Sequence, residues 1–479
     1  MNYRIVGKTT ATVMLIEAVC LIIMMSVSLI YRENPLPFLY TIIILALLGG
    51  ILYLITRSAN VYSSRGGFVS VMFSWIVLAA FGALPFYFNG GFGNYINCLF
   101  EATSGFTTTG ATILTEISIL PRGILMWRSF THFIGGMGIL VLSSAILPAS
   151  GNRAHYLMQA EVPGPTSDKL VPSLAKSSKI LYTIYCALTA SMCVALLIAG
   201  LPLYDSLCVA FSTAGTGGFS VLNNSIAGYN SVAVNLITSV FMLMFSINFT
   251  VYFLILTGKI KRALKSEELR FFLGLVAVST LIIGANIYSK YGNVFECFVN
   301  SFFVVSSTIS TTGFTIVDYN LWPAISHSLI VIIMFCGACA GSTGGGIKSS
   351  RIVMTFKSIV REIKQIIHPN SVNIIRLDGK AVSNDVIKSV LRFVCAFFAI
   401  TFFGTFLVSV DNFDFTTNFT AILSCMSNVG PGLGAVGPAS NFAGFSGFSK
   451  VVMTLCMLIG RLEIFPILIF FSPSAWKKV

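Results

Sequence analysis

The stretch Ser104-Gly-Phe-Thr-Thr-Thr-Gly110 decides the fold, because the chain carries three altered copies of it. The copies read Ser-Thr-Ala-Gly-Thr-Gly-Gly218, Ser-Thr-Ile-Ser-Thr-Thr-Gly313 and Ser-Cys-Met-Ser-Asn-Val-Gly430. Each copy begins with Ser, six positions before its last glycine, and has Thr or Asn two positions before that glycine. A pattern that returns about every hundred residues indicates an internal repeat.

Long apolar runs surround these four stretches. The chain has 479 residues, of which 55% are hydrophobic and only 10% charged. A soluble domain is about a quarter charged, so this composition excludes one. Ten runs are long enough to cross about 30 Å of hydrocarbon, near residues 12–31, 36–56, 68–88, 123–147, 179–200, 231–257, 269–288, 322–347, 387–410 and 451–472.

A shorter, semi-apolar segment precedes each copy and ends in its Gly/Thr/Ser-rich run. We therefore expect an all-α integral membrane protein with four units of span, short pore helix, loop and span around one pseudo-fourfold pore. Two further N-terminal spans stand outside the repeat. The expected division is residues 1–67 for the N-terminal spans, then 68–178, 179–268, 269–386 with an intramembrane gate loop, and 387–479.

The four loops predict an ion pathway. Non-helical backbone inside a membrane must face protein or water, and glycine tolerates the positive φ that turns carbonyl groups toward one axis. Rings of such oxygens can replace the hydration shell of a cation. Close helix packing on small residues would explain one such loop, but not four in register. The predicted potassium-binding filter comprises Thr108, Thr109, Gly110, Thr216, Gly217, Gly218, Thr311, Thr312, Gly313, Asn428, Val429 and Gly430.

A glycine-rich interruption of the eighth run predicts a gate. The stretch Gly341-Ser342-Thr343-Gly344-Gly345-Gly346 contains no good helix former and precedes Lys348. A phosphate-binding loop requires Gly directly before Lys, and Ile347 intervenes here. An obstructing loop below the filter and a packing kink remain as interpretations, and we favour the loop.

Charged residues within apolar runs are few. Arg461 lies in the last run, where a buried charge points to a cavity or a partner; a role in the gate and a structural ion pair are both open. Glu101, in the first short segment, either pairs with Arg128 or stands apart.

The net charge of +13 is better explained by membrane topology than by nucleic-acid binding. Most of the 30 basic residues fall in alternate loops, and basic loops are cytoplasmic. We therefore expect both termini to be cytoplasmic and expect no nucleic-acid partner.

Several short motifs resemble the Trk/Ktr/HKT superfamily of potassium transporters, and most closely its bacterial Trk membrane subunits (TrkH/TrkG). They are Thr107-Thr-Thr-Gly-Ala-Thr112, Thr216-Gly-Gly-Phe-Ser220, Ser310-Thr-Thr-Gly-Phe314, Asn428-Val-Gly-Pro-Gly-Leu-Gly434, Trp127-Arg-Ser, His132-Phe-Ile-Gly-Gly-Met-Gly138, Ala340-Gly-Ser-Thr-Gly-Gly-Gly-Ile-Lys348 and Gly460-Arg-Leu-Glu463. The resemblance covers essentially the whole chain.

The resemblance implies potassium uptake across the bacterial inner membrane, with selectivity favoured by glycine at position 110. It also implies that Arg461 is a positive barrier below the filter, that the chain is a homodimer in membrane lipid, and that a cytosolic nucleotide-binding ring of RCK type (TrkA-like) docks on it. We expect channel-like flux of K⁺, with symport coupled to protons or sodium as the alternative. The chain is expected to be no enzyme and to hold no cofactor beyond the transported ion.

Overall fold

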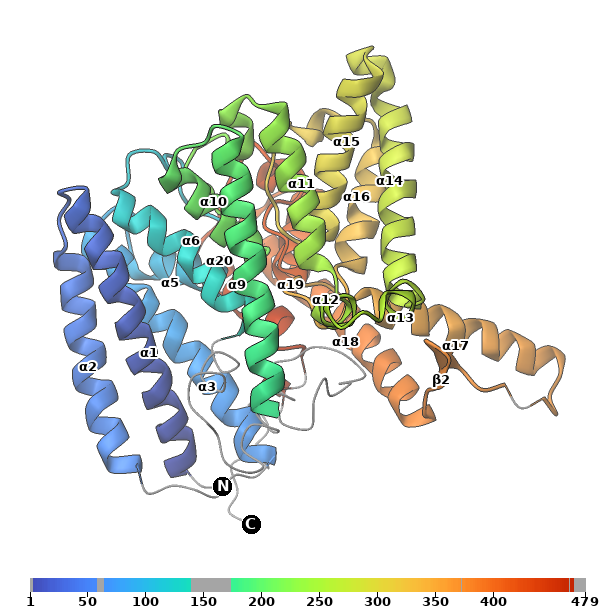
Figure 1. The fold of residues 1–479 in the computed structure, drawn as a ribbon, viewed down its shortest axis with the longest axis horizontal. Helices are drawn as coiled ribbons and strands as arrows, with labels where there is room; N and C mark the ends of the chain where they lie inside the picture. The colour runs from blue at the N-terminus through green and yellow to red at the C-terminus, as the bar shows by residue number, and fades with distance from the viewer. Residues whose placement is uncertain (1–2, 58–63, 139–173, 372, 465, 469–479) are drawn as a thin grey trace.

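The computed structural model describes residues 3–57, 64–138, 174–371, 373–464 and 466–468, and this part of the chain is mostly helical. Two N-terminal helices, α1 (Tyr3–Ile30) and α2 (Leu36–Thr56), pack against each other at one side of the molecule (Figure 1). Helix α1 also contacts α3 and α6, which attaches this pair to the rest of the molecule.

The remaining helices follow one order four times: a long helix, a short helix, a loop and a second helix. The long helices are α3 (Ser64–Gly82) with its continuation α4 (Leu84–Asn89), α9 (Leu174–Ile198), α14 (Glu267–Tyr291) and α18 (Asn384–Val408). The short helices are α5 (Tyr95–Phe106), α10 (Leu203–Ala214), α15 (Val294–Ile309) and α19 (Phe415–Ser427). The second helices are α6 (Arg122–Met137), α11 (Val232–Ser246) with α12 (Phe249–Leu256), α16 (Ala324–Cys336) and α20 (Gly447–Arg461).

The other elements are short, apart from one helix that projects from the body. They are η1 (Ser225–Tyr229), α13 (Ile260–Leu264), η2 (Tyr319–Leu321), α17 (Ser349–Ile367), β1 (Arg376–Leu377), β2 (Lys380–Ala381), η3 (Ser409–Asp411) and η4 (Gly434–Val436). The two strands form an antiparallel ribbon.

Local sequence signals fix where the short helices begin. Asn94 caps α5 by accepting from the N–H of Asn97, and Asn293 caps α15 by accepting from Phe295 and Glu296. Asp414 caps α19, and its hydrogen bonds with the hydroxyl and N–H of Thr417 hold the pKa of this carboxyl below its usual range. Such caps satisfy N–H groups that the first helical turn leaves free.

The second helices differ from the predicted spans. The runs 231–257 and 322–347 are not continuous helices: α11 and α12 meet at a bend of 92°, and α16 ends at Cys336. The run 123–147 is helical to Met137, with 139–147 outside the described residues, and the run 451–472 is helical only to Arg461 before a turn. Hydropathy alone could not locate the bend between α11 and α12, because the residues around it are as apolar as the helices. The glycine-rich stretch 341–346 did indicate that the run 322–347 is interrupted.

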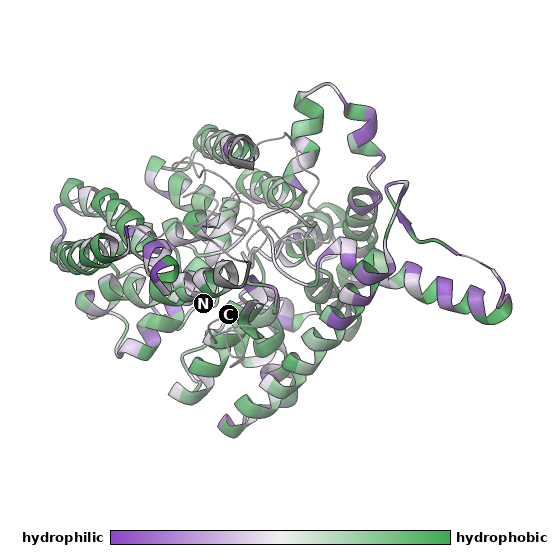
Figure 2. Ribbon diagram, turned by 90° about the horizontal axis from the view of Figure 1, so that it is seen from below, coloured by the Kyte–Doolittle hydropathy of each residue, from purple (hydrophilic) through white to green (hydrophobic). Residues whose placement is uncertain are grey.

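Among the described residues, fewer helices than the ten predicted runs are long and apolar enough to cross a membrane. Within the described residues there are six, or seven if the bent pair counts as one span. Leu36–Thr56 is the least buried of the six, with 22% of its most apolar window inside the molecule. Hydrophobic residues cover these outer helices (Figure 2), as expected for surfaces that face lipid.

Residues 357–386, between the runs 322–347 and 387–410, contain regular secondary structure. Helix α17 occupies the stretch to Ile367 and extends away from the body as an arm, followed by the β1–β2 ribbon (Figure 1). Its side chains alternate between basic and apolar along the helix, which leaves Phe356, Ile363 and Ile366 exposed.

Close backbone packing of α6 on the first loop gives a stability prediction. A Cβ added at Gly135 would overlap the carbonyl group of Phe106. We expect Gly135→Ala to lower the free energy of unfolding by about 1–3 kcal/mol, the usual cost of overpacking. Thermal unfolding of the purified protein in detergent measures the effect.

The matched control is Gly274→Ala in α14, where an added Cβ meets nothing within 4 Å. Alanine is the better helix former, so this variant should unfold at the wild-type temperature or slightly above it. Equal destabilisation of both variants would contradict the packing argument.

Candidate ion-conducting site

The four short helices end in the same backbone turn. In each, the residue two positions before the glycine has a left-handed backbone: φ is 57° at Thr108, 58° at Thr216, 60° at Thr311 and 54° at Asn428. The next N–H donates to the carbonyl oxygen of the first Ser of the motif, at 2.8 Å for Thr109 to Ser104 and Gly217 to Ser212, 2.9 Å for Thr312 to Ser307 and 3.0 Å for Val429 to Ser424. This six-residue closure is the Schellman end of a helix.

The left-handed residue of that turn is usually glycine, but here it is threonine three times. Threonine is β-branched, and a positive φ at such a residue is a true outlier. Strain of this kind persists where the surrounding structure over-determines the backbone, and it gathers at functional sites. The backbone strain is smaller at Asn428, because asparagine tolerates this conformation.

The four glycines bring the loops together in a closed ring. Gly110, Gly218, Gly313 and Gly430 have φ between 77° and 100°. A Cβ on Gly110 would overlap the carbonyl oxygen of Gly217, one on Gly218 that of Thr312, and one on Gly313 that of Val429. A Cβ on Gly430 would lie 2.8 Å from the carbonyl oxygen of Thr109, which returns to the first loop. Each loop thus places a backbone oxygen against the glycine of a neighbour.

An open cavity of about 430 Å³ lies on one side of this ring. All four glycines line it, together with residues that follow them in each loop, such as Thr112, Ser220, Thr315 and Pro431. The last residue of each predicted filter triplet therefore lies at one vestibule, although these four glycines come from widely separated parts of the chain.

The glycine-rich segment lies against the opposite side of the ring. Residues 337–348 are non-helical and surround a cavity of about 60 Å³ with Asn428, Gly460 and Arg461. The N–H of Gly345 donates to the hydroxyl of Thr311 (2.7 Å), so the segment touches the third loop of the ring directly. The Lys348 ammonium donates back to the carbonyl of Gly344 and closes the segment on itself.

The break in the second unit receives this segment. The N–H of Cys339 donates to Ser246 (3.0 Å) and the N–H of Phe249 to Gly341 (3.1 Å), at the point where α11 gives way to α12. Two interruptions of apolar helices thus satisfy each other's backbone groups, which lipid could not do.

Arg461 lies at the end of α20 rather than in the middle of a span. Its guanidinium donates to the carbonyl oxygens of Gly135 (2.5 Å), Gly136 (2.6 Å) and Thr343 (2.8 Å). It also approaches the hydroxyl of Thr108 at 3.3 Å. One side chain therefore joins the glycine-rich segment to the first unit, directly beneath the ring. The neighbouring Glu463 pairs with Arg351 instead.

Two residues near the site were missed by the sequence analysis. Glu268, at the start of α14, accepts from the N–H of Ala340 (2.6 Å) and of Ser350 (3.0 Å), on both sides of the glycine-rich segment. His132 is fully buried, stacks on Phe219 and fills the space beside Gly217. An acidic residue at a helix start resembles an ordinary cap, and an isolated histidine carries no spacing signal, so neither stood out.

A polytopic helical protein with a ring of re-entrant backbone loops between two cavities belongs to the membrane transport proteins rather than to the enzymes. The family described as "TrkH: Cation transport protein" matches residues 37–478. The chain therefore belongs to the TrkH family.

Named relatives and a solved structure agree with this assignment. The chain is 37% identical over 468 residues to the Trk system potassium uptake protein TrkG of Escherichia coli, covering 95% of this chain and 94% of that one. It is 35% identical to TrkH of Salmonella typhimurium over the full length of both proteins. The crystal structure of the potassium transporter TrkH from Vibrio parahaemolyticus superposes with a TM-score of 0.90 at 31% identity, covering all of both chains.

Asn428 gives a prediction on the ring itself. Its amide donates to the hydroxyl of Thr109 (2.9 Å) and the carbonyl of Met457 (3.1 Å). Asn428→Thr installs the residue of the other three loops but removes both bonds and adds a β-branch at positive φ. We expect a loss of about 1–3 kcal/mol in stability, measured by thermal unfolding in detergent.

Asn224→Thr serves as the control, since Asn224 lies exposed at the vestibule with φ of −87°. It should unfold as the wild type does. A stable Asn428→Thr variant would mean that the fourth loop does not depend on its amide.

Proposed function

We propose that this chain is the membrane subunit of a potassium uptake system and conducts K⁺ through the ring of four loops. The observation that carries the proposal is the cyclic contact of backbone carbonyls with the four glycines. The names of the relatives, potassium uptake proteins, supply the ion.

The ring suits dehydrated cations for an electrostatic reason. Peptide carbonyl groups are strong, uncharged dipoles, and several of them around one axis can replace water at a monovalent cation without trapping it. The four short helices direct their C-terminal, partially negative ends toward the same place. The filter in this proposal is the set predicted from sequence, residues 108–110, 216–218, 311–313 and 428–430.

The segment 341–346 and Arg461 form the gate in this proposal. Both lie below the ring, and the Arg461 guanidinium is a fixed positive charge in the path of a cation. Opening requires the segment to break its hydrogen bonds with Thr311 and Arg461, and to rearrange those that it makes with the α11–α12 break and with Glu268.

The driving force in this proposal is the membrane potential, and symport with protons or sodium is the competing mechanism. Purified protein in liposomes separates the two. Rubidium uptake driven by a negative internal potential, without any proton or sodium gradient, supports passive flux. Uptake that requires such a gradient supports symport, and no uptake in either condition overturns the potassium proposal.

Topology and partners complete the proposal. The termini and the basic loops face the cytoplasm of a bacterial inner membrane, where an RCK-type nucleotide-binding ring docks. The arm α17 supports a homodimer, since Phe356, Ile363 and Ile366 are 61%, 51% and 79% exposed on a projecting helix. An apolar face of this kind is typical of a contact between chains.

Gly110→Ser is predicted to admit more sodium relative to potassium. A side chain at this position has an unfavourable φ and overlaps the Gly217 carbonyl, so the first two loops must separate. Competition of Na⁺ with ⁸⁶Rb⁺ uptake in liposomes measures the ratio. Gly50→Ser in α2, where a Cβ meets nothing within 4 Å, is the control; an unchanged ion ratio in Gly110→Ser would contradict the filter assignment.

Arg461→Gln is predicted to raise basal ⁸⁶Rb⁺ flux without any soluble partner, because it removes a partly buried cation and weakens the hydrogen bonding to Thr343. Arg461→Lys keeps the charge but loses the planar fork, so it should raise flux less. Equal, wild-type flux in both variants would place the gate elsewhere.

A further inference from the structure

A buried ion pair lies behind the first two loops of the ring. The Nε and Nη2 atoms of Arg128, on α6, both donate to Oε1 of Glu101, on α5, at 3.0 and 2.8 Å. The side chains are 1% and 0% exposed. The pairing that the sequence left open is therefore present in the structure.

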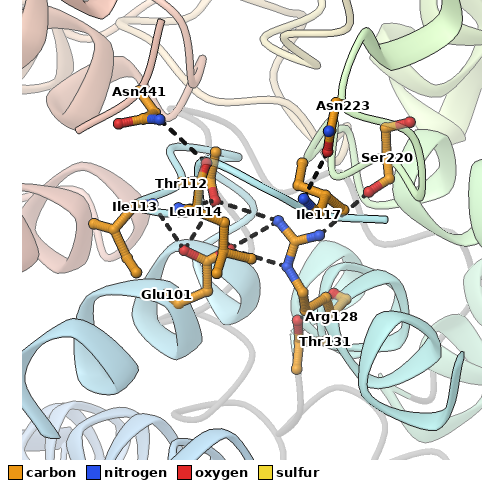
Figure 3. Close-up of polar contacts among 10 residues, drawn as sticks. All are labelled: Glu101, Thr112, Ile113, Leu114, Ile117, Arg128, Thr131, Ser220, Asn223 and Asn441. Carbon is orange, nitrogen blue, oxygen red and sulfur yellow. Dashed lines mark hydrogen bonds and ion pairs between the residues drawn. The ribbon is translucent and has the colours of Figure 1, made fainter. Parts of the chain in front are cut away.

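The remaining hydrogen bonds of this pair go to the filter loops. Glu101 accepts from the hydroxyl of Thr112 (2.9 Å) and from the N–H of Ile113 (3.1 Å), just after Gly110. The Nη1 atom of Arg128 donates to the carbonyl oxygen of Ser220 (3.2 Å), just after Gly218, and its guanidinium lies 4.2 Å from the ring centre of Phe219. Figure 3 shows both loops converging on this one pair.

The third and fourth loops are each closed by a hydrogen bond from a serine hydroxyl. The hydroxyl of Ser307 donates to the carbonyl oxygen of Phe314 (2.6 Å), and the hydroxyl of Ser424 donates to that of Gly430 (2.5 Å). The equivalent hydroxyls of Ser104 and Ser212 make no hydrogen bond to any residue that the structure describes. The first two loops, which lack these hydroxyl bonds, are the two that hydrogen-bond to the ion pair.

We propose that Glu101 and Arg128 are positioning residues that fix the first two filter loops and thereby set the discrimination between potassium and sodium. This inference rests on the proposed function and adds residues outside the filter to it. A buried ion pair is weak evidence for stability, because its desolvation offsets its attraction. Here Glu101 and Arg128 also hydrogen-bond to the backbone that follows Gly110 and Gly218, respectively. These bonds connect the ion pair to the distances between the loops of the ring.

A looser ring would favour sodium. Sodium is the smaller ion, so carbonyls that can move inward would coordinate it better than a ring held at the potassium spacing. We call the Glu101–Arg128 ion pair, with its hydrogen bonds to the two loops, the brace. Loss of the brace therefore changes the preference for potassium over sodium, whereas loss of a simple contact between α5 and α6 would change only stability.

The test compares full-length variants in liposomes by the competition of Na⁺ with ⁸⁶Rb⁺ uptake. Arg128→Lys keeps the charge but loses the fork that reaches both Glu101 and Ser220. We expect the preference for potassium over sodium to fall about tenfold, equivalent to about 1.4 kcal/mol. Glu101→Gln should shift the ratio in the same direction.

The control is Glu33→Gln. Glu33 accepts from the N–H of Arg122 (2.7 Å) and Gly123 (3.0 Å) and so caps α6, the same helix that carries Arg128, away from the ring. It should unfold at a lower temperature with an unchanged ion ratio. If Arg128→Lys does not fold, Thr112→Val removes the hydroxyl that donates to Glu101 and accepts from the N–H of Leu114, and it should lower the ratio by a smaller factor.

The outcomes separate this inference from the proposed function. A wild-type protein that takes up no ⁸⁶Rb⁺ overturns the proposed function. A selective wild type whose Arg128→Lys or Thr112→Val variant folds and keeps the wild-type ratio overturns the brace, as does an equal loss of selectivity in Glu33→Gln.

Discussion

Close approach of backbone to backbone at four glycines is the constraint on which the structure depends. Each carbonyl oxygen in the ring occupies space that a Cβ would fill, so the loops meet only where the side chain is a hydrogen. The left-handed turn before each glycine aims the loop, and the carbonyl of the motif's first Ser closes that turn. The short helices must therefore end at one depth, and the longer helices enclose them.

The repeated motif made the order of helices and the four loops predictable, because its spacing reports equivalent backbone. The motif did not indicate which atoms of its recurring Ser form hydrogen bonds. The recurring Ser acts through its main-chain carbonyl in all four loops, and its hydroxyl is used at Ser307 and Ser424 only, within the described residues. The break after Ser246 was not predictable, since apolar composition is the same in a continuous helix and in one whose free backbone groups pair with another segment. The interruption after Cys336, in contrast, was indicated by the glycine-rich stretch 341–346.

One buried and one partly buried arginine lie on the two sides of the ring. Arg128 lines the outer cavity and Arg461 the inner one. Both direct most of their donors at backbone carbonyls or a carboxylate rather than at open space. A guanidinium held in this way orders loops that have no regular secondary structure, and arginine suits the task because its planar fork binds several acceptors at once. Sequence position marked both residues as unusual, but only their contacts distinguish the one that joins loops of the ring from the one that holds the glycine-rich segment.

The four units have equivalent backbone conformations, but different side-chain contacts hold their loops. The first two loops share one ion pair, whereas the third and fourth are each closed by a serine hydroxyl. The third loop also receives the glycine-rich segment through Thr311, and the fourth replaces threonine with Asn428. In the proposed function, movement of the glycine-rich segment acts on the third loop through Thr311, whereas the proposed Glu101–Arg128 brace holds the first two loops. The proposal thus assigns gating motion and ion discrimination to different contacts of one ring.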